Sequence, residues 1–361
     1  MPSFLCLLFS CEIQPVDSSS EDKYLAEEKG NSSPRPSRYF FFKRKKELSW
    51  LLAGSFVFDF RHKNSSSRPT ARRRRPAPAA MEISTHNGSA LFSCDDSPNV
   101  PALQPLWDFV RRREDLIKSP FFPALFNFAI YTAFCLPFIA LDLLSPWISV
   151  LRKYKIQPQT SPTLQMVVLC LAQSIYHHLV CIFPVTVAHW YWRPVSLPSI
   201  APEVPALLLQ LAACLLLFDF LSFLWHLLHH KVPWLYKNFH KVHHKHLSTF
   251  ALTTQYASVW ELLWLGFFAV IGPMLLRCHP LTEMTFFVAN IWLSVEDHSG
   301  YDLPWSTHRL VPFGLYGGAP HHDLHHLKFK FNYAPYFTHW DRLFGTLSQA
   351  VNPSKVKVNQ D

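Results

Sequence analysis

Histidine is concentrated in one short stretch of the chain, residues 226–246, which reads HLLHHKVPWLYKNFHKVHHKH. A helix through its first residues would place His226, His229 and His230 on one face, because residues three and four apart are neighbours there. The same stretch repeats the pattern as HxxHH at His240, His243 and His244. A third cluster, HHDLHH, follows further along the chain and comprises His321, His322, His325 and His326.

These clusters predict a binuclear metal centre. Neutral imidazole is the commonest protein ligand for iron, copper and zinc. No cluster contains a cysteine that would favour a structural zinc site. One tetrahedral zinc takes about four ligands, and a catalytic zinc takes about three from the protein. Because the clusters supply many more imidazoles than one ion can bind, we expect two transition-metal ions.

Acidic residues near the clusters are expected to orient the imidazoles. Asp219 lies seven residues before His226 in an otherwise apolar segment, where an ionisable group is costly and is functional by default. We expect it to accept the free N–H of a ligand imidazole. Glu261, Asp297 and Asp323 are further candidates for this role. His298, which follows an apolar helix and precedes a glycine turn, is expected to be a further metal ligand.

The composition indicates a membrane protein. About half of the 361 residues are hydrophobic and 15% are aromatic, yet the formal net charge is +9. Apolar segments next to basic loops are typical of a chain whose cationic face meets anionic headgroups. No nucleic-acid motif accompanies this charge, so no nucleic-acid partner is expected. The eight cysteines are scattered without a CxxC pair, which argues against a disulfide framework.

Three long apolar segments are expected to be transmembrane helices: 121–144, 163–192 and 204–228. At about 1.5 Å per residue, each could cross about 30 Å of hydrocarbon. A fourth apolar region, 257–295, is interrupted by Gly272 and Pro273. It is interpreted as a broken pair of shorter helices, re-entrant, lying against the bundle, or forming a hairpin. The sequence therefore predicts an all-α polytopic membrane protein.

The rest of the chain divides around this membrane-embedded domain, which we place at 121–350. Residues 1–80 are low-complexity and basic, and are expected to be a disordered extension, with Met81 a plausible start. Residues 81–120 form a polar and amphipathic segment that contains a glycosylation sequon at Asn87. Residues 351–361 are expected to be a flexible tail.

The distribution of basic residues predicts the orientation in the membrane. Lysines surround the first two histidine clusters at Lys231, Lys237, Lys241 and Lys245. By the positive-inside rule, the clusters face the cytosol, and three crossings then place the N-terminal side and the Asn87 sequon in the lumen. The basic triplet at 111–113 argues for the opposite orientation.

The three clusters resemble the histidine boxes of the fatty acid hydroxylase/sterol desaturase superfamily of membrane di-metal oxygenases. The boxes are HLLHH, HKVHH and HHDLHH, in that order. The linking segments KVPWLYKNFHKVHH, WLSVEDHSGYDLPWSTHRLVPFG and NYAPYFTHWD are most similar to the sterol 25-hydroxylases of that superfamily. The similarity extends from about residue 103 to residue 347 and covers none of the first 80 residues.

This resemblance implies a diiron centre that uses O2 and two electrons to hydroxylate a sterol, cholesterol at C25, in the endoplasmic reticulum membrane. It implies these ligands: His226, His230, His240, His243, His244, His298, His322, His325 and His326, with His229 and His321 as further contributors. The chain contains no nicotinamide or flavin fingerprint. Electrons from NADPH are therefore expected to arrive through a partner, cytochrome b5 or a reductase, and the lysines around the boxes could dock such an acidic carrier.

Other functions remain open on the sequence. A C4-methylsterol oxidase, a lipid desaturase or a fatty acid hydroxylase would carry the same boxes, and only the linking segments favour hydroxylation at C25. A membrane metal-binding protein without activity would be favoured by the loss of a box histidine, and none is missing. A zinc hydrolase would need far fewer ligands.

Overall fold

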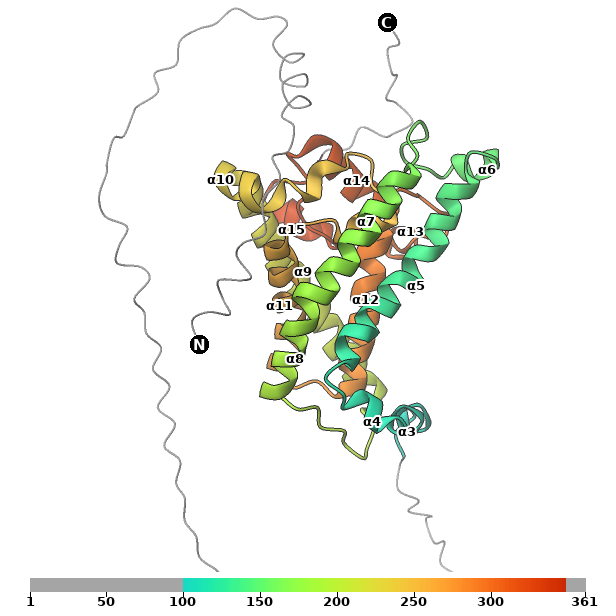
Figure 1. Cartoon of the computed structure of the whole chain (residues 1–361). Coiled ribbons are helices and arrows are strands. Elements are labelled where there is room, and N and C mark those ends of the chain that lie inside the picture. The colour runs from blue at the N-terminus through green and yellow to red at the C-terminus, as the bar shows by residue number, and fades with distance from the viewer. Residues whose placement is uncertain (1–99, 349–361) are drawn as a thin grey trace, which may run out of the picture. The chain divides into compact units, whose positions relative to one another are not determined.

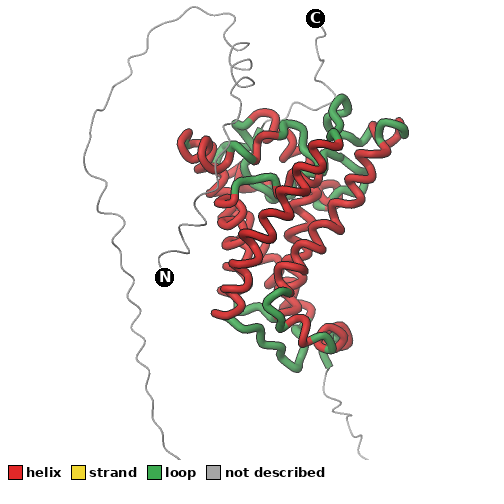
Figure 2. The backbone as a smooth tube through the Cα atoms, in the orientation of Figure 1, coloured by secondary structure: helices red, strands yellow, loops and turns green. Residues whose placement is uncertain are grey.

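The computed structural model describes residues 100–348 of the 361. Helices account for all of the regular secondary structure in that range, and no strand forms within it (Figure 2). The predicted all-α class is therefore confirmed. The predictions for the extension 1–80, the Asn87 sequon and the tail 351–361 lie outside the described residues.

Three helices are long and apolar enough to cross a membrane, as the sequence predicted. They are α5 (Phe122–Leu144), the continuous segment Leu164–Trp192 and α9 (Val204–Lys231). Helix α9 continues beyond the predicted end at residue 228, so the whole first histidine cluster lies on its last turns.

The second span contains a local distortion of the helix. It consists of α7 (Leu164–His177), a π-helical turn η1 (His178–Ile182) and α8 (Phe183–Trp192). Pro184, in the first turn of α8, has no N–H to donate to the turn before it. The N–H of Phe183 bonds to the carbonyl of His178, five residues back, which is the hydrogen bond of a π-bulge.

The interrupted apolar region forms a helical pair, α11 (Val259–Leu275) and α12 (Pro280–Asp297). Helix α11 packs along α9, and α12 packs against both α5 and α9. Gly272 allows the close approach of α11, because a Cβ atom there would lie 3.2 Å from the Cα atom of Cys214 on α9. The two helices therefore lie against the bundle, one of the arrangements that the sequence left open.

Short elements lie at both ends of the bundle (Figure 1). The α3 and α4 helices (Gln104–Arg111 and Glu114–Ile117) lie at the end opposite the histidine clusters. The remaining short elements are α6 (Ser149–Arg152), α10 (Pro233–Leu235), the π-helical turn η2 (Tyr236–His240), the 3₁₀ turns η3 (His243–Lys245), η4 (Ala251–Gln255) and η5 (Pro312–Gly314), and helices α13 (Thr307–Leu310), α14 (Gly318–Lys328) and α15 (Thr338–Leu343).

The η4 turn is buried between the first two spans. The hydroxyl of Tyr131 on α5 donates to the carbonyl of Leu252 (3.1 Å), and the Ser174 hydroxyl on α7 donates to the Gln255 side chain (2.7 Å). Ala251 and Leu252 are 1% and 2% exposed. Irregular backbone at membrane depth is tolerated only where protein buries it and satisfies its polar groups. These contacts meet that condition.

A buried ion pair between α5 and Lys155 lies against the segment that follows His298. The ammonium of Lys155 lies 2.5 Å from Asp142, and both side chains are almost fully buried. The Tyr301 hydroxyl donates to the same carboxylate (3.0 Å). The N–H of Ile156 donates to the carbonyl of Gly300 (3.0 Å). These contacts fix the chain just after His298.

Candidate metal centre

The first histidine cluster projects from the last turns of α9. His226 and His230 lie four residues apart on this helix, and their ring centroids are 4.9 Å apart. The Nδ1–H of His226 donates to the carbonyl of Tyr333 (2.7 Å). The helix ends at Lys231, just before Pro233, which prevents it from continuing past the cluster.

The second cluster occupies two tight turns rather than an α-helix. The π-helical turn η2 ends at His240, and the N–H of Lys241 bonds to the carbonyl of Tyr236 (2.8 Å). The 3₁₀ turn η3 then carries His243 and His244. This change of helical geometry turns the two adjacent imidazoles in different directions.

The third cluster lies on α14, and His298 lies directly after α12. His322 and His326 are four residues apart on one face of α14, and His325 is directed elsewhere. The Nδ1–H of His325 donates to the carbonyl of Phe331 (2.7 Å), and that of His298 donates to the carbonyl of Ser294 (2.8 Å).

The imidazoles converge into two groups, in each of which the ligand nitrogens lie within 4.8 Å of one another. The five-histidine group comprises His226, His230, His240, His244 and His325. The four-histidine group comprises His243, His298, His322 and His326. Two pairs of adjacent residues, His243–His244 and His325–His326, each contribute one imidazole to each group. The two groups therefore lie side by side.

The spacing of the nitrogens fits a metal ion in each group. In the five-histidine group, the Nε2 atom of His244 lies 2.9 Å from that of His240 and 3.0 Å from that of His230. In the four-histidine group, the Nε2 atoms of His322 and His298 are 2.9 Å apart. Two ligands about 2.1 Å from one ion, at right angles, are separated by about 3.0 Å.

The hydrogen-bonding pattern places unprotonated nitrogens toward the centre of each group. A carbonyl oxygen only accepts, so the Nδ1 atoms of His226, His298 and His325 carry the protons. Their Nε2 atoms are then lone-pair donors, the form that binds a metal. The Nε2 atom of His226 is buried and has no hydrogen-bond partner among the described residues. An ion in the five-histidine group would satisfy it.

The electrostatics keep these imidazoles neutral. Burial, followed by the charge of neighbouring imidazoles, holds the pKa of His243, His244 and His322 well below the ordinary value of 6.5. Burial also lowers the pKa of His298 to about 4. Neutral imidazole is the ligand form, so the site is ready to bind a metal at neutral pH.

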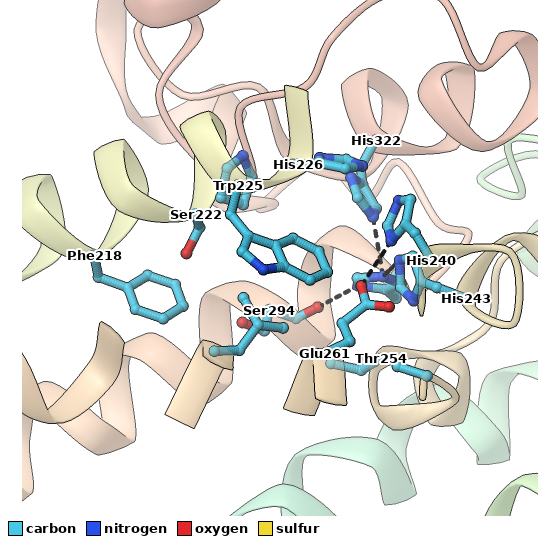
Figure 3. Close-up of a pocket in the computed structure, with 14 residues that line it drawn as sticks. Phe218, Ser222, Trp225, His226, His240, His243, Thr254, Glu261, Ser294 and His322 are labelled. Carbon is cyan, nitrogen blue, oxygen red and sulfur yellow. Dashed lines mark hydrogen bonds and ion pairs between the residues drawn. The ribbon is translucent and has the colours of Figure 1, made fainter. Parts of the chain in front are cut away.

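Four carboxylates were predicted to orient imidazoles. Among them, Glu261 contacts an imidazole of the five-histidine group. Its Oε1 atom lies 2.9 Å from Nδ1 of His240 (Figure 3). Asp297 instead accepts the hydroxyl of Tyr316 (2.7 Å), and Asp323 accepts the side-chain amide of Gln157 (3.0 Å).

The expected contact of Asp219 with an imidazole is replaced by two contacts with backbone. It accepts the N–H groups of Tyr336 (2.7 Å) and Phe337 (3.2 Å). Seven residues correspond to about 10 Å along a helix. That distance is too long for Asp219 to reach the ring of His226, although the two residues share a face.

Two box histidines, His229 and His321, are not among the imidazoles whose nitrogens converge in either group. His229 lies between His226 and His230 in the sequence but has other contacts. Its ring stacks on Trp225, with centroids 3.6 Å apart. The Nε2 atom of His321 lies 3.3 Å from Oδ2 of Asp341. The structure brings neither ring into a group, and their contribution as ligands stays a prediction.

Comparison with known proteins adds a second line of evidence. The model of the fatty acid hydroxylase family matches residues 211–346, a range that contains all three histidine clusters. The cholesterol 25-hydroxylase-like protein of Danio rerio is 64% identical over 245 residues, which are 68% of this chain and 98% of the relative. The cholesterol 25-hydroxylase of Homo sapiens is 60% identical over 253 residues, which are 70% and 93%.

The chain belongs to the fatty acid hydroxylase family. The resemblance of its histidine boxes and linking segments to that superfamily is thereby confirmed. The cholesterol 25-hydroxylase of Mus musculus is similar as well, with 58% identity over 271 residues, 75% of this chain and 91% of the relative. No solved structure matches the chain.

The hydroxylase has a cavity next to its two histidine groups (Figure 3). It is lined by imidazoles from both groups, among them His226, His240 and His322. Its lining also includes apolar side chains, among them Phe218 on α9 and Leu265 on α11. The cavity can therefore bring an apolar group up to both candidate metal positions.

Several groups that orient the boxes could not be found from the sequence. The carbonyls of Ser294, Phe331 and Tyr333 accept imidazole protons, but every residue has a carbonyl, so no residue type marks them. Asp341 is buried and lies against the third box, where it contacts His321. Its place in NYAPYFTHWD, a segment similar to the family, was the available signal.

Proposed function

We propose that this chain hydroxylates cholesterol at C25, at a diiron centre formed by the two histidine groups. Membership of the family and similarity to cholesterol 25-hydroxylases make the chain a sterol hydroxylase. The observation that carries the finer proposal is the single cavity shared by both groups of imidazoles and by apolar side chains. The reaction would consume the C–H bond, O2, two electrons and two protons, and give the alcohol and water.

The donor set supports iron. Nine neutral imidazoles and no thiolate in the two groups suit iron better than a structural zinc site. When bound, iron would supply the oxidising power that no side chain has. The imidazoles hold the ions, and the carbonyls of Phe331 and Tyr333 fix the direction of two of these rings.

The cavity supports an apolar substrate that enters from the bilayer. Phe218 and Leu265 lie on two apolar helices and line the cavity together with the imidazoles. The outer face of α11 exposes Trp260, Trp264 and Phe267, which are 45–50% accessible. We propose that the sterol approaches along this face with its flexible tail toward the imidazoles. The apolar lining would exclude water from the reacting carbon.

Electron supply is assigned to a partner. The chain carries no nicotinamide or flavin fingerprint, so NADPH would act through cytochrome b5 or a reductase. Lys231, Lys237 and Lys245 are exposed beside the boxes and could attract an acidic carrier. The same lysines support a cytosolic orientation of this end by the positive-inside rule, in the membrane of the endoplasmic reticulum.

The test uses membranes from sterol-fed cells that express the full chain. We would compare the wild type with His322→Gln/His325→Gln, which removes one imidazole from each group, and quantify oxysterols by mass spectrometry. His229→Gln is the matched control, because its ring lies outside both groups. A 25-hydroxysterol in the wild type and the control, but absent from the double variant, is expected.

Other products would change the proposal in defined ways. Consumption of 4-methylsterols without a 25-hydroxysterol would replace it with a C4-methylsterol oxidase. A well-expressed wild type that forms no oxidised lipid would contradict the oxygenase function. Iron content, measured on the purified protein, would separate loss of metal from loss of substrate binding.

A further inference from the structure

The loop between α14 and α15, residues 329–337, carries two of the carbonyls that orient box imidazoles. The carbonyl of Phe331 accepts from His325, and that of Tyr333 accepts from His226, each at 2.7 Å. Both imidazoles belong to the five-histidine group. The position of this loop therefore sets the direction of two of its five rings.

The backbone of this loop is strained. Phe329 and Asn332 both have φ angles of +59°, in the left-handed region that side chains with a Cβ atom rarely adopt. Such conformations persist only where the surrounding structure holds them in place. The loop therefore needs contacts from the rest of the chain.

Asp341 holds the middle of the loop. Its Oδ1 atom accepts the N–H of Tyr333 (2.9 Å), and its Oδ2 atom accepts the N–H of Ala334 (2.9 Å). The hydroxyl of Thr346 donates to Oδ1 (2.7 Å), and the Nε2 atom of His321 lies 3.3 Å from Oδ2. Although burial opposes ionisation, these hydrogen bonds keep the pKa of Asp341 below its ordinary value. A carboxylate that accepts four donors is a strong anchor.

Asp219 holds the end of the same loop. It lies on α9 and is 0% exposed. Its two oxygens accept the N–H groups of Tyr336 (2.7 Å) and Phe337 (3.2 Å). Two buried aspartates from different helices thus bind four consecutive or nearly consecutive N–H groups of one loop.

Among the described residues, no imidazole of the four-histidine group donates to a carbonyl of this loop, and the loop reaches that group's support only through the hydroxyl of Tyr336, which bonds to the Ser294 side chain (2.6 Å). His298 donates to Ser294, which lies on α12. The backbone neighbours of His243 and His326, at Tyr256 and His246, also lie outside the loop. A shift of the loop carbonyls would therefore act directly on imidazoles of the five-histidine group and less directly on those of the other.

We propose that Asp219 and Asp341 are positioning residues that hold the 329–337 loop and thereby set the metal affinity of the five-histidine group alone. This inference rests on the proposed function, since it requires that both groups bind metal. The two ions of the centre would then be held by independent supports. A substitution in the loop anchor would produce a protein with one strongly bound ion.

The test measures metal binding by the purified full chain in detergent, with Fe²⁺ as the probe. Asp341→Asn keeps the size of the side chain. Its amide N–H would face a backbone N–H, and two donors cannot form a hydrogen bond with each other. Chelator competition and metal analysis should give two bound ions for the wild type. For the variant, we expect one ion held as in the wild type and one weakened about 10–100-fold, the usual effect of losing an outer-shell partner. Asp219→Asn should weaken the same ion.

A control separates positioning from general destabilisation. Trp107→Phe removes a partly buried hydrogen bond from α3 to the carbonyl of Pro198, and α3 lies at the end of the described helices opposite α14 (Figure 1). It should lower the thermal stability and leave both affinities unchanged. If Asp341→Asn does not accumulate, Thr346→Val removes one hydrogen bond to Asp341 and should weaken the same ion by a smaller factor.

Each outcome decides between the two proposals. Two unchanged affinities in the aspartate variants, or two affinities lowered equally, would overturn the inference and leave the proposed function intact. A folded wild type that binds no iron would remove the proposed function, and the inference with it.

Discussion

The two histidine groups lie side by side but are supported differently. In the five-histidine group, His226 and His325 donate to loop carbonyls, and His240 contacts Glu261. In the four-histidine group, His298 donates to the Ser294 carbonyl, and the backbone of Tyr256 and His246 lies beside His243 and His326. The five-histidine group is thus oriented by a loop and a carboxylate, whereas the four-histidine group is oriented by backbone next to its own elements.

The largest effect is expected where the two groups meet. His243→Gln and His244→Gln change adjacent residues that serve different groups. Each should lower hydroxylation by at least about 100-fold, because a lost ligand costs more than a lost outer-shell partner. Metal analysis should show that each variant loses a different ion. Loss of both ions from His243→Gln and neither from His244→Gln would contradict the division into two groups.

A large effect on stability is expected from the ion pair near the four-histidine group. Lys155→Met leaves the buried carboxylate of Asp142 without its cation, which should cost about 3–5 kcal/mol of unfolding free energy. Since this pair fixes the chain after His298, the ion of the four-histidine group should also be retained less well. Thermal unfolding and metal retention are the measurements. An unchanged unfolding temperature would show that the pair does not support this side of the site.

A smaller effect is expected from the carboxylate that contacts the five-histidine group. Glu261→Gln replaces a buried carboxylate that contacts Nδ1 of His240 with a neutral amide of the same shape. The affinity of the five-histidine group should fall about 10-fold, within the range for such partners. Competition with a chelator would measure it. Equal weakening of both ions would contradict the assignment of Glu261 to one group.

Acid should destabilise the metal-free protein through His298 of the four-histidine group. Burial lowers the pKa of His298 from 6.5 to about 4, so between these values the unfolded chain binds a proton that the folded chain does not. The unfolding free energy should therefore fall as the pH drops from about 6.5 to about 4, and change little above that window from this group. Thermal unfolding in a chelator across this pH range is the measurement. His298→Asn should flatten the slope.

The smallest effect is expected at a histidine that belongs to neither group. His229→Gln should change hydroxylation by less than about twofold and stability by less than about 1 kcal/mol, because its ring stacks on Trp225 at the side of the site. Product analysis and thermal unfolding would measure both. A loss as large as that of His230→Gln would show that His229 takes part in binding the metal.

Residue type and spacing were sufficient to predict the spans and the boxes. The apolar lengths and the HxxHH patterns are local properties, and the structure places α9 and the clusters where these patterns indicated. The partner of Asp219 was wrong because sharing a helical face does not imply contact over two turns. The division of the imidazoles into two groups depends on how α9, α12, α14 and the η2 and η3 turns converge, which is a long-range property that local residue patterns do not predict.

The pairs His243–His244 and His325–His326 have a consequence for how this enzyme can diversify. Each pair links the two groups through a single peptide unit, whose Cα atoms are about 3.8 Å apart whatever the rest of the fold does. The separation of the two centres is therefore insensitive to changes in the helices that line the cavity. Under the proposed function, substitutions at Phe218 or Leu265 would alter which carbon the lipid presents while the spacing of the two groups is kept. Selectivity and reactivity would then vary separately.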